Sequence, residues 1–100
     1  MKSFNERIYE VCRKIPSGRV STYKELANAL NCKAYRAVGN AMNKNPYAPE
    51  VPCHRVVSSD GGIGGFASGS KNKIKMLKEE NVFVVDGKIV DFEKKLFKFH

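Results

Sequence analysis

The stretch "GRVSTYKELANALNCKAYRAVGNAMNKNP", residues 18–46, decides the fold. Thr22 and Glu25 stand at the spacing of a capping box, which predicts that a helix begins there. Leucines and alanines over 26–30 give a short helix, an Asn-Cys turn follows, and a longer helix is expected from about 33 to 43. A short helix, a tight turn and a longer helix are typical of a helix-turn-helix. Helical hairpins of this size are common, so the outline alone leaves DNA binding open.

The longer helix combines small residues with basic ones. Arg36 stands among the small residues, with Lys33 one turn earlier. Because small side chains project little from the helix, a flat polyanion could come close to Arg36. Alternatively, the small residues pack against the first helix of the chain and Arg36 is a solvated charge. The small residues are Ala34, Ala37, Gly39 and Ala41.

The N-terminal segment predicts one more helix ahead of the hairpin. Ser3 and Glu6 repeat the capping-box spacing, and Pro16 with Gly18 ends the pattern. Apolar residues between them recur at helical spacing and are expected to form core. They are Phe4, Ile8, Val11, Cys12 and Ile15.

The C-terminal third predicts a helix and then a hairpin. The helix carries Ile74, Met76 and Leu77. The segment "VFVVDGKIVDF" then alternates around Asp86-Gly87, which is a strong short-range hairpin signal. The lysines around this hairpin are expected to lie on solvated faces.

Residues 45–69 are expected to form a loop that packs down on the domain. They hold three of the four prolines and most of the glycines, a composition usually retained for a site or a linker. A linker is excluded because valines, Ile63 and Phe66 are too apolar to stay in water.

Length and charge limit the classes of protein. One hundred residues make one domain, and 42% hydrophobic residues are ordinary for a globular chain. A net charge of +8 and a pI near 9.6 favour a polyanionic partner, with nucleic acid ahead of an anionic membrane. No apolar run is long enough for a membrane span and no signal peptide is recognisable, so a cytoplasmic protein is expected.

The cysteines do not predict disulfides or a metal site. Cys12, Cys32 and Cys53 are odd in number and irregular in spacing. No CxxC pair occurs, and His54 and His100 lie far apart, so neither a metal nor another cofactor is expected.

The segment "EVPCHRVVSS", residues 50–59, places a thiol beside an imidazole and a guanidinium. A thiol that attacks needs an electropositive and partly sheltered setting, because the thiolate is the nucleophile. Neighbours in sequence rarely point at each other, so His54 would reach Cys53 through a water or a bent backbone. From spacing alone, hydrolase, redox-sensor and transferase chemistry all stay open.

Several blocks in the same order resemble the alkylguanine-DNA alkyltransferases, also called methylated-DNA–protein-cysteine methyltransferases. "PCHRVV" is the most specific, and "GRVSTYKELA", "KAYRAVGNAMNKNP", "GGIGGFASGS" and "MLKEE" accompany it. The resemblance covers nearly the whole chain. It implies one catalytic and DNA-binding domain over residues 1–100, mainly α with small β elements and a helix-turn-helix (winged-helix-like). It also implies a monomer that binds double-stranded DNA containing alkylated guanine.

The resemblance implies a role for each of five residues in the reaction. Cys53 would accept the alkyl group from the 6-oxygen of guanine, and possible substrates include 6-O-methylguanine and 4-O-methylthymine. His54 would act as its base through a water, with Glu80 orienting His54. Asn45 would join the same hydrogen-bond network, and Tyr23 would polarise the departing guanine.

The resemblance also implies how DNA is held. Arg36 would enter the duplex and fill the gap left by the extruded base, with the helix docked in the minor groove. The DNA-facing residues would be Lys33, Ala34, Tyr35, Arg36 and Ala37, and the guanine pocket would comprise Arg55, Val56, Gly64, Gly65 and Phe66.

Two departures and two rival functions remain. Many family members carry an additional N-terminal domain that is absent from this sequence, and Phe66 stands where they usually have tyrosine.

Alkyltransferase-like proteins bind alkylated DNA without repairing it and recruit other machinery, but commonly replace the cysteine by tryptophan. This chain has Cys53 and no tryptophan. A helix-turn-helix regulator with a redox-sensing thiol would leave Asn45 and Glu80 unexplained.

Overall fold

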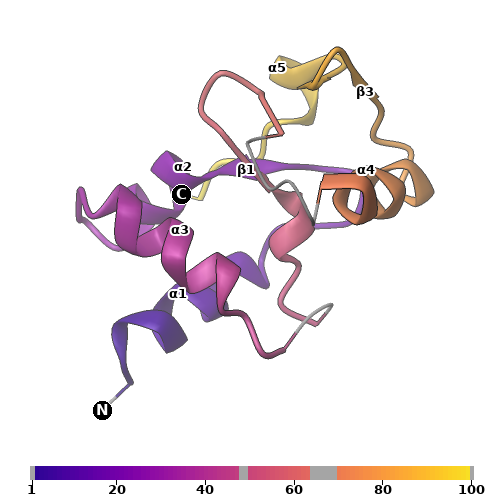
Figure 1. The fold of residues 1–100 in the computed structure, drawn as a ribbon. Helices are drawn as coiled ribbons and strands as arrows, with labels where there is room; N and C mark the ends of the chain where they lie inside the picture. Colours follow the sequence, from indigo (N-terminus) through magenta and orange to yellow (C-terminus); the bar gives the residue numbers. More distant parts are fainter. Residues whose placement is uncertain (1, 48–49, 64–69, 100) are drawn as a thin grey trace.

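The structure is a computed structural model that describes residues 2–47, 50–63 and 70–99 (Figure 1). It is mainly helical with short strands, as the sequence predicts. In chain order the elements are α1 (Phe4–Cys12), β1 (Ser21–Thr22), α2 (Tyr23–Ala29), α3 (Tyr35–Asn43), the 3-10 helix η1 (Cys53–Arg55), β2 (Val56–Val57), α4 (Ser70–Glu79), β3 (Val84–Val85), β4 (Lys88–Ile89) and α5 (Phe92–Lys95).

Both predicted capping residues begin helices. The Ser3 hydroxyl accepts a hydrogen bond from the Glu6 amide (3.2 Å) at the start of α1. The Thr22 hydroxyl accepts one from the Glu25 amide (3.0 Å) at the start of α2. Each bond satisfies an amide that has no partner inside its own helix, so the polar side chain fixes the first turn.

The helix-turn-helix is confirmed, although α3 begins two residues later than predicted. Asn31 makes the turn with a φ of 55°. Lys33 and Ala34 stay outside α3, and no side chain caps the helix at Ala34. α3 then buries Val38, Ala41 and Met42 against the other two N-terminal helices.

A parallel strand pair that the sequence did not predict joins the two halves of the chain. Ser21 pairs with Val56 and Thr22 with Val57. β1 runs directly into α2, and η1 runs directly into β2. The pairing therefore sets the start of α2 beside the turn that begins at Cys53, inside the segment that was expected to be only loop.

The predicted C-terminal hairpin is confirmed. β3 and β4 pair antiparallel, with Val84 opposite Ile89 and Val85 opposite Lys88. Asp86 and Gly87 both have positive φ (52° and 76°), which a tight two-residue turn of this kind requires.

The described core has two clusters. One lies among α1, α2, α3 and η1 and includes Ile8, Cys12 and Leu26. The other joins β2, α4 and the hairpin through residues such as Val57 and Leu77. α5, which the sequence did not predict, leads the C-terminal segment along Val20, whose amide and carbonyl bond to Lys95 and Phe97.

Within the described ranges 2–47, 50–63 and 70–99, the helices are all too short or too polar to cross a bilayer.

Candidate active site around Cys53

The cysteine begins a tight turn that is anchored in the core. Val51 and Pro52 are buried, and the Cys53 amide donates to the Val51 carbonyl (2.8 Å). The Arg55 amide closes the turn on the Pro52 carbonyl (2.9 Å). Cys53 is a free, half-buried cysteine. Its thiol thus sits on a rigid backbone at the edge of the core.

Asn45 supports this turn from the preceding loop. Its amide nitrogen Nδ2 donates to the Val51 carbonyl (2.8 Å), which also accepts from Cys53. Its Oδ1 accepts from the Tyr47 amide (3.0 Å). The resemblance placed Asn45 in the hydrogen-bond network of His54. In the described part of the chain, Asn45 instead bonds to the loop backbone and reaches Cys53 through one shared carbonyl.

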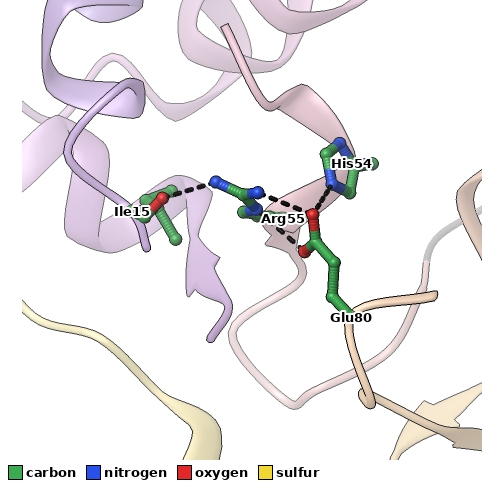
Figure 2. Close-up of polar contacts among 4 residues, drawn as sticks. All are labelled: Ile15, His54, Arg55 and Glu80. Carbon is green, nitrogen blue, oxygen red and sulfur yellow. Dashed lines mark hydrogen bonds and ion pairs between the residues drawn. The ribbon is translucent and has the colours of Figure 1, made fainter. Parts of the chain in front are cut away.

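His54, Arg55 and Glu80 form one polar cluster (Figure 2). Figure 2 shows the Glu80 carboxylate between the His54 imidazole and the Arg55 guanidinium. His54 Nε2 lies 3.1 Å from Glu80 Oε2, and Arg55 donates to the two carboxylate oxygens at 2.9 and 2.6 Å. Arg55 also donates to the Ile15 carbonyl (2.8 Å), which ties the cluster to the segment after α1. Two side chains of one turn thereby hold the carboxylate, and that turn is itself tied to the segment after α1.

The environment sets the charges of this cluster. Burial opposes ionisation of Glu80, but hydrogen bonds from Arg55 and His54 outweigh it and hold the pKa of Glu80 below its ordinary value. Burial lowers the pKa of His54 and exceeds the opposing effect of Glu80. At neutral pH Glu80 is therefore a carboxylate and His54 a neutral imidazole.

A neutral imidazole bound to a carboxylate can act as a base. With Nε2 donating its proton to Glu80, Nδ1 keeps its lone pair and can accept a proton. A nucleophile, a base and a group that orients the base are the parts of an activated thiol. The structure brings His54 and Glu80 together, as the resemblance implies, with Cys53 adjacent to His54 in the same turn.

Tyr23 is the first residue of α2 and lies close enough to Cys53 for their charges to interact. Burial, and then the charges of Cys53 and Cys12, raise the pKa of Tyr23 to about 12. The phenol therefore keeps its proton at neutral pH and can serve as a hydrogen-bond donor.

Lys73 is a site residue that the sequence reasoning missed. No role was predicted for Lys73, but it is only 7% exposed, and its ammonium donates to the Val56 carbonyl. It is buried because α4 packs one face against η1 and β2. Lys73, Leu77 and Glu80 follow at spacings of four and three along that face. This spacing is the signal that could have found Lys73.

The start of α3 presents the predicted DNA-facing residues to solvent. Lys33, Ala34, Tyr35 and Arg36 are exposed and Ala37 is half-buried. Ala41 is fully buried and its carbonyl accepts from the Tyr9 hydroxyl, so the small residues divide between surface and packing. A groove of about 410 Å³ connects this surface to Tyr23, and its lining is Tyr23, Lys24, Tyr35, Ser58 and Ser59.

The predicted guanine pocket is described only in part. Gly64, Gly65 and Phe66 lie outside the described residues. Val56 is buried and its carbonyl accepts from Lys73. The Arg55 guanidinium binds Glu80 and Ile15, so its main contacts belong to the polar cluster. The placement of these residues against guanine stays a prediction.

Comparison with known proteins places the chain in a family. The model of the family described as "6-O-methylguanine DNA methyltransferase, DNA binding domain" matches residues 3–82. The chain belongs to this family. The Methylated-DNA--protein-cysteine methyltransferase of Methanosarcina barkeri is 48% identical over 80 residues, which are 78% of this chain and 51% of that protein. The chain thus spans about half the length of the curated relatives it matches.

Two solved structures have a fold similar to that of this chain. The O6-methylguanine-DNA methyltransferase of the archaeon Pyrococcus kodakaraensis is 46% identical with a TM-score of 0.72, over 82% of this chain and 48% of that one. S. pombe Atl1, solved in complex with damaged DNA containing O6-carboxymethylguanine, is 30% identical with a TM-score of 0.86. That match covers 99% of this chain and 100% of the other.

Proposed function

We propose that this protein repairs DNA by moving the alkyl group of 6-O-alkylguanine to its own Cys53. The observation that carries the proposal is the neutral His54, held by an ionised Glu80, in the same rigid turn as a free and half-buried thiol. Family membership supports the substrate class, since the curated relatives are named methylated-DNA--protein-cysteine methyltransferases.

The target atom lies inside a stacked duplex, so the nucleotide has to turn out before it reacts. Turning a base out costs a few kcal/mol, which a side chain inserted in its place can offset. Arg36 is exposed on α3 and is the side chain that is inserted in place of the displaced base. The groove lined by Tyr35 and Tyr23 lies against this helix, and Tyr23 is near enough to Cys53 for their charges to interact, so we expect the displaced nucleotide to enter there.

The transfer is a displacement at the alkyl carbon. The Cys53 proton passes through a water to His54, the sulfur–carbon bond forms, and the bond from carbon to the guanine 6-oxygen breaks. The electron pair stays with guanine, which takes a proton donated by Tyr23. The thioether has no easy reverse, so each molecule reacts once. A cytoplasmic location fits this chemistry because thiols stay reduced there.

Mass measurement tests this function directly. After incubation with duplex DNA containing 6-O-methylguanine, we expect one added methyl on the peptide that carries Cys53. Excess DNA should give one equivalent of repair per protein, and Cys53→Ser should show no transfer while still binding DNA. Unmodified duplex is the control. Repair of a large excess of lesions by a small amount of protein would contradict the proposal.

A second function is favoured by the match to S. pombe Atl1, which covers 99% of this chain and 100% of that chain. In that function the protein binds alkylated DNA without repairing it and marks the lesion for other machinery. The same experiment separates the two functions. Tight binding to methylated duplex with no change in mass would select the sensor.

A further inference from the structure

The groove that lies against α3 has two walls that begin side by side. One wall is Tyr23, the residue after β1, and the other begins at Ser58, the residue after β2. Because Thr22 pairs with Val57, the parallel strands hold the first residues of both walls next to each other. Ser59 extends the second wall and is exposed. The width of the groove therefore depends on what holds the outer part of this second wall.

The second wall continues into a tight turn, residues 58–62. The Gly61 amide donates to the Ser58 carbonyl (2.9 Å), and the Ser58 amide donates to the Gly62 carbonyl (2.9 Å). The Asp60 carboxylate accepts a further hydrogen bond from the Gly62 amide (2.9 Å). All these bonds lie within the turn, so they fix its shape but not its position relative to Tyr23.

The C-terminal segment, residues 83–99, holds this turn from outside. The Ile63 amide donates to the Gly87 carbonyl (2.8 Å), and the Ile89 amide donates to the Gly61 carbonyl (2.9 Å). Phe92, the first residue of α5, packs on Gly61 so closely that a methyl group added there would lie 3.0 Å from its ring. Two hydrogen bonds and one ring contact therefore position the turn.

The same segment continues to the first wall. The Lys95 carbonyl accepts a hydrogen bond from the Val20 amide (2.9 Å), and the Phe97 amide donates to the Val20 carbonyl (2.7 Å). The buried Ser21 hydroxyl donates to the Phe97 carbonyl (2.8 Å). Val20 and Ser21 lead through β1 into Tyr23. One continuous segment thus supports both walls of the groove.

We propose that the C-terminal segment sets the width of this groove and so determines how well the protein distinguishes a displaced alkylated nucleotide from unmodified duplex DNA. Phe92 is a positioning residue that acts through the turn at Ser58. The segment follows residues 3–82, the region that the family model matches. The inference rests on the proposed function in one respect: a displaced nucleotide has to enter the groove, as both repair and lesion sensing require.

The expected effect is moderate and concerns binding. A wall that is in place before DNA binds does not have to be ordered in the complex, and ordering a side chain on binding lowers affinity about fivefold. Attraction of α3 to the phosphate backbone does not depend on this wall, so binding to unmodified duplex should not change.

The test compares, by fluorescence anisotropy, binding to two duplexes that differ only in one 6-O-methylguanine. Every protein carries Cys53→Ser, so that methyl transfer does not alter the DNA during the measurement. Phe92→Ala should bind the methylated duplex about fivefold more weakly and the unmodified duplex as before. Phe83→Ala is the matched control, because it removes the same side chain from the same segment where the ring is 49% exposed. It should follow the parent protein on both duplexes.

Ser21→Ala tests the support of the other wall with little change in packing. It removes the hydroxyl that donates to the Phe97 carbonyl, while the backbone bonds of Val20 remain. We expect about twofold weaker binding, on the methylated duplex only. Denaturant unfolding of each variant shows whether it is folded, and this milder substitution keeps the test decisive if Phe92→Ala does not fold.

Three outcomes would overturn the role of the C-terminal segment: a parent protein that binds both duplexes equally, folded Phe92→Ala and Ser21→Ala variants that keep the parent's ratio of affinities, or a Phe83→Ala variant that loses as much as Phe92→Ala. Methyl transfer by the wild type is measured separately. Transfer with an unchanged ratio in the variants would remove this role alone. A lowered ratio without transfer would keep the role and remove the repair function.

Discussion

α3 and α4 differ in whether they bury a charge: the charged side chain of α3 is exposed, whereas α4 buries one of its lysines. On α4, Lys73 is 7% exposed and contacts the Cys53 turn, and Glu80 just after the helix is bound by His54 and Arg55. On α3, Arg36 is exposed and the buried face is apolar. In the view of Figure 1, the turn at η1 lies between the two helices.

This difference assigns the chemistry to α4 and the Cys53 turn, and the binding of DNA to α3. A buried charge costs free energy and is retained with partners, so changing it should alter both stability and reactivity. An exposed charge costs little to keep, so changing it should leave the folded protein intact and affect only what docks on it. The predictions below put this division of roles to the test.

The largest effect is expected at Glu80. Glu80→Gln removes the carboxylate that receives two hydrogen bonds from Arg55 and one from His54. Glu80 and Arg55 are half-buried, so removing the charged partner should cost about 2 kcal/mol in the free energy of unfolding. Methyl transfer should slow about 100-fold, because the base loses its orienting group. Denaturant unfolding and single-turnover rates measure the two effects.

Glu79→Gln is the matched control for this prediction. Glu79 is the exposed neighbour at the end of the same helix, so its substitution removes an equal charge from the protein. We expect wild-type unfolding and rates for it. Equal losses in both variants would mean that overall charge matters and that the cluster does not.

The second effect is confined to high pH and concerns the pH dependence of stability at Lys73. Its pKa is about 8 in the folded protein and 10.5 ordinarily. Below pH 8 both states hold the proton, and the folded state bears the full cost of the buried charge. Between pH 8 and 10.5 the folded state releases the proton while the unfolded state keeps it, so stability rises with pH.

The comparison is therefore wild type against Lys73→Met. The free energy of unfolding of the wild type should gain about 3 kcal/mol relative to the variant over this range. Cys12 and Tyr23, whose pKa values burial raises to about 12, oppose the gain at high pH in both proteins. The charge of Lys73 lowers the pKa of Cys12, so the opposition from Cys12 is larger in the variant. Denaturant unfolding at a series of pH values measures the difference. A difference that is flat with pH would show that Lys73 is not a buried ammonium.

Much of the fold was predictable because its signals are local. Ser3 and Thr22 begin the helices that their capping patterns predict, and Asp86-Gly87 makes the predicted turn. The pairing of Ser21 with Val56 was not predictable, since two-residue strands far apart in sequence have no periodicity of their own. α3 started late because no side chain near Lys33 caps it.

The site also has some residues that local sequence signals identify and others whose position depends on tertiary packing. The Cys53 and His54 pair could be found because its members are adjacent, and family resemblance added Glu80. The burial of Lys73 is harder to find, since its sequence neighbours Lys71 and Lys75 are exposed and only the helical spacing to Leu77 and Glu80 sets Lys73 apart. The bond from Asn45 to the Val51 carbonyl likewise depends on the path of a loop.

The smallest effect is expected at Arg36, on the helix that directs its charge outward. Arg36→Ala should leave unfolding unchanged, because the side chain is exposed. Repair of duplex DNA should slow about tenfold, since the cost of turning the base out is no longer offset. Reaction with the free base 6-O-methylguanine should change little, because no duplex has to open. Single-turnover rates on the two substrates give the ratio.

The ratio between substrates is what distinguishes an inserted side chain from a general attraction to phosphate. Lys44→Ala, an exposed cation at the other end of α3, removes the same charge and should affect duplex binding only through its salt dependence. A loss for Arg36→Ala that vanishes at high salt would reduce Arg36 to a phosphate contact. A loss that persists at high salt, and only on duplex, would place the base-opening function on α3 and leave the chemistry to α4 and the Cys53 turn.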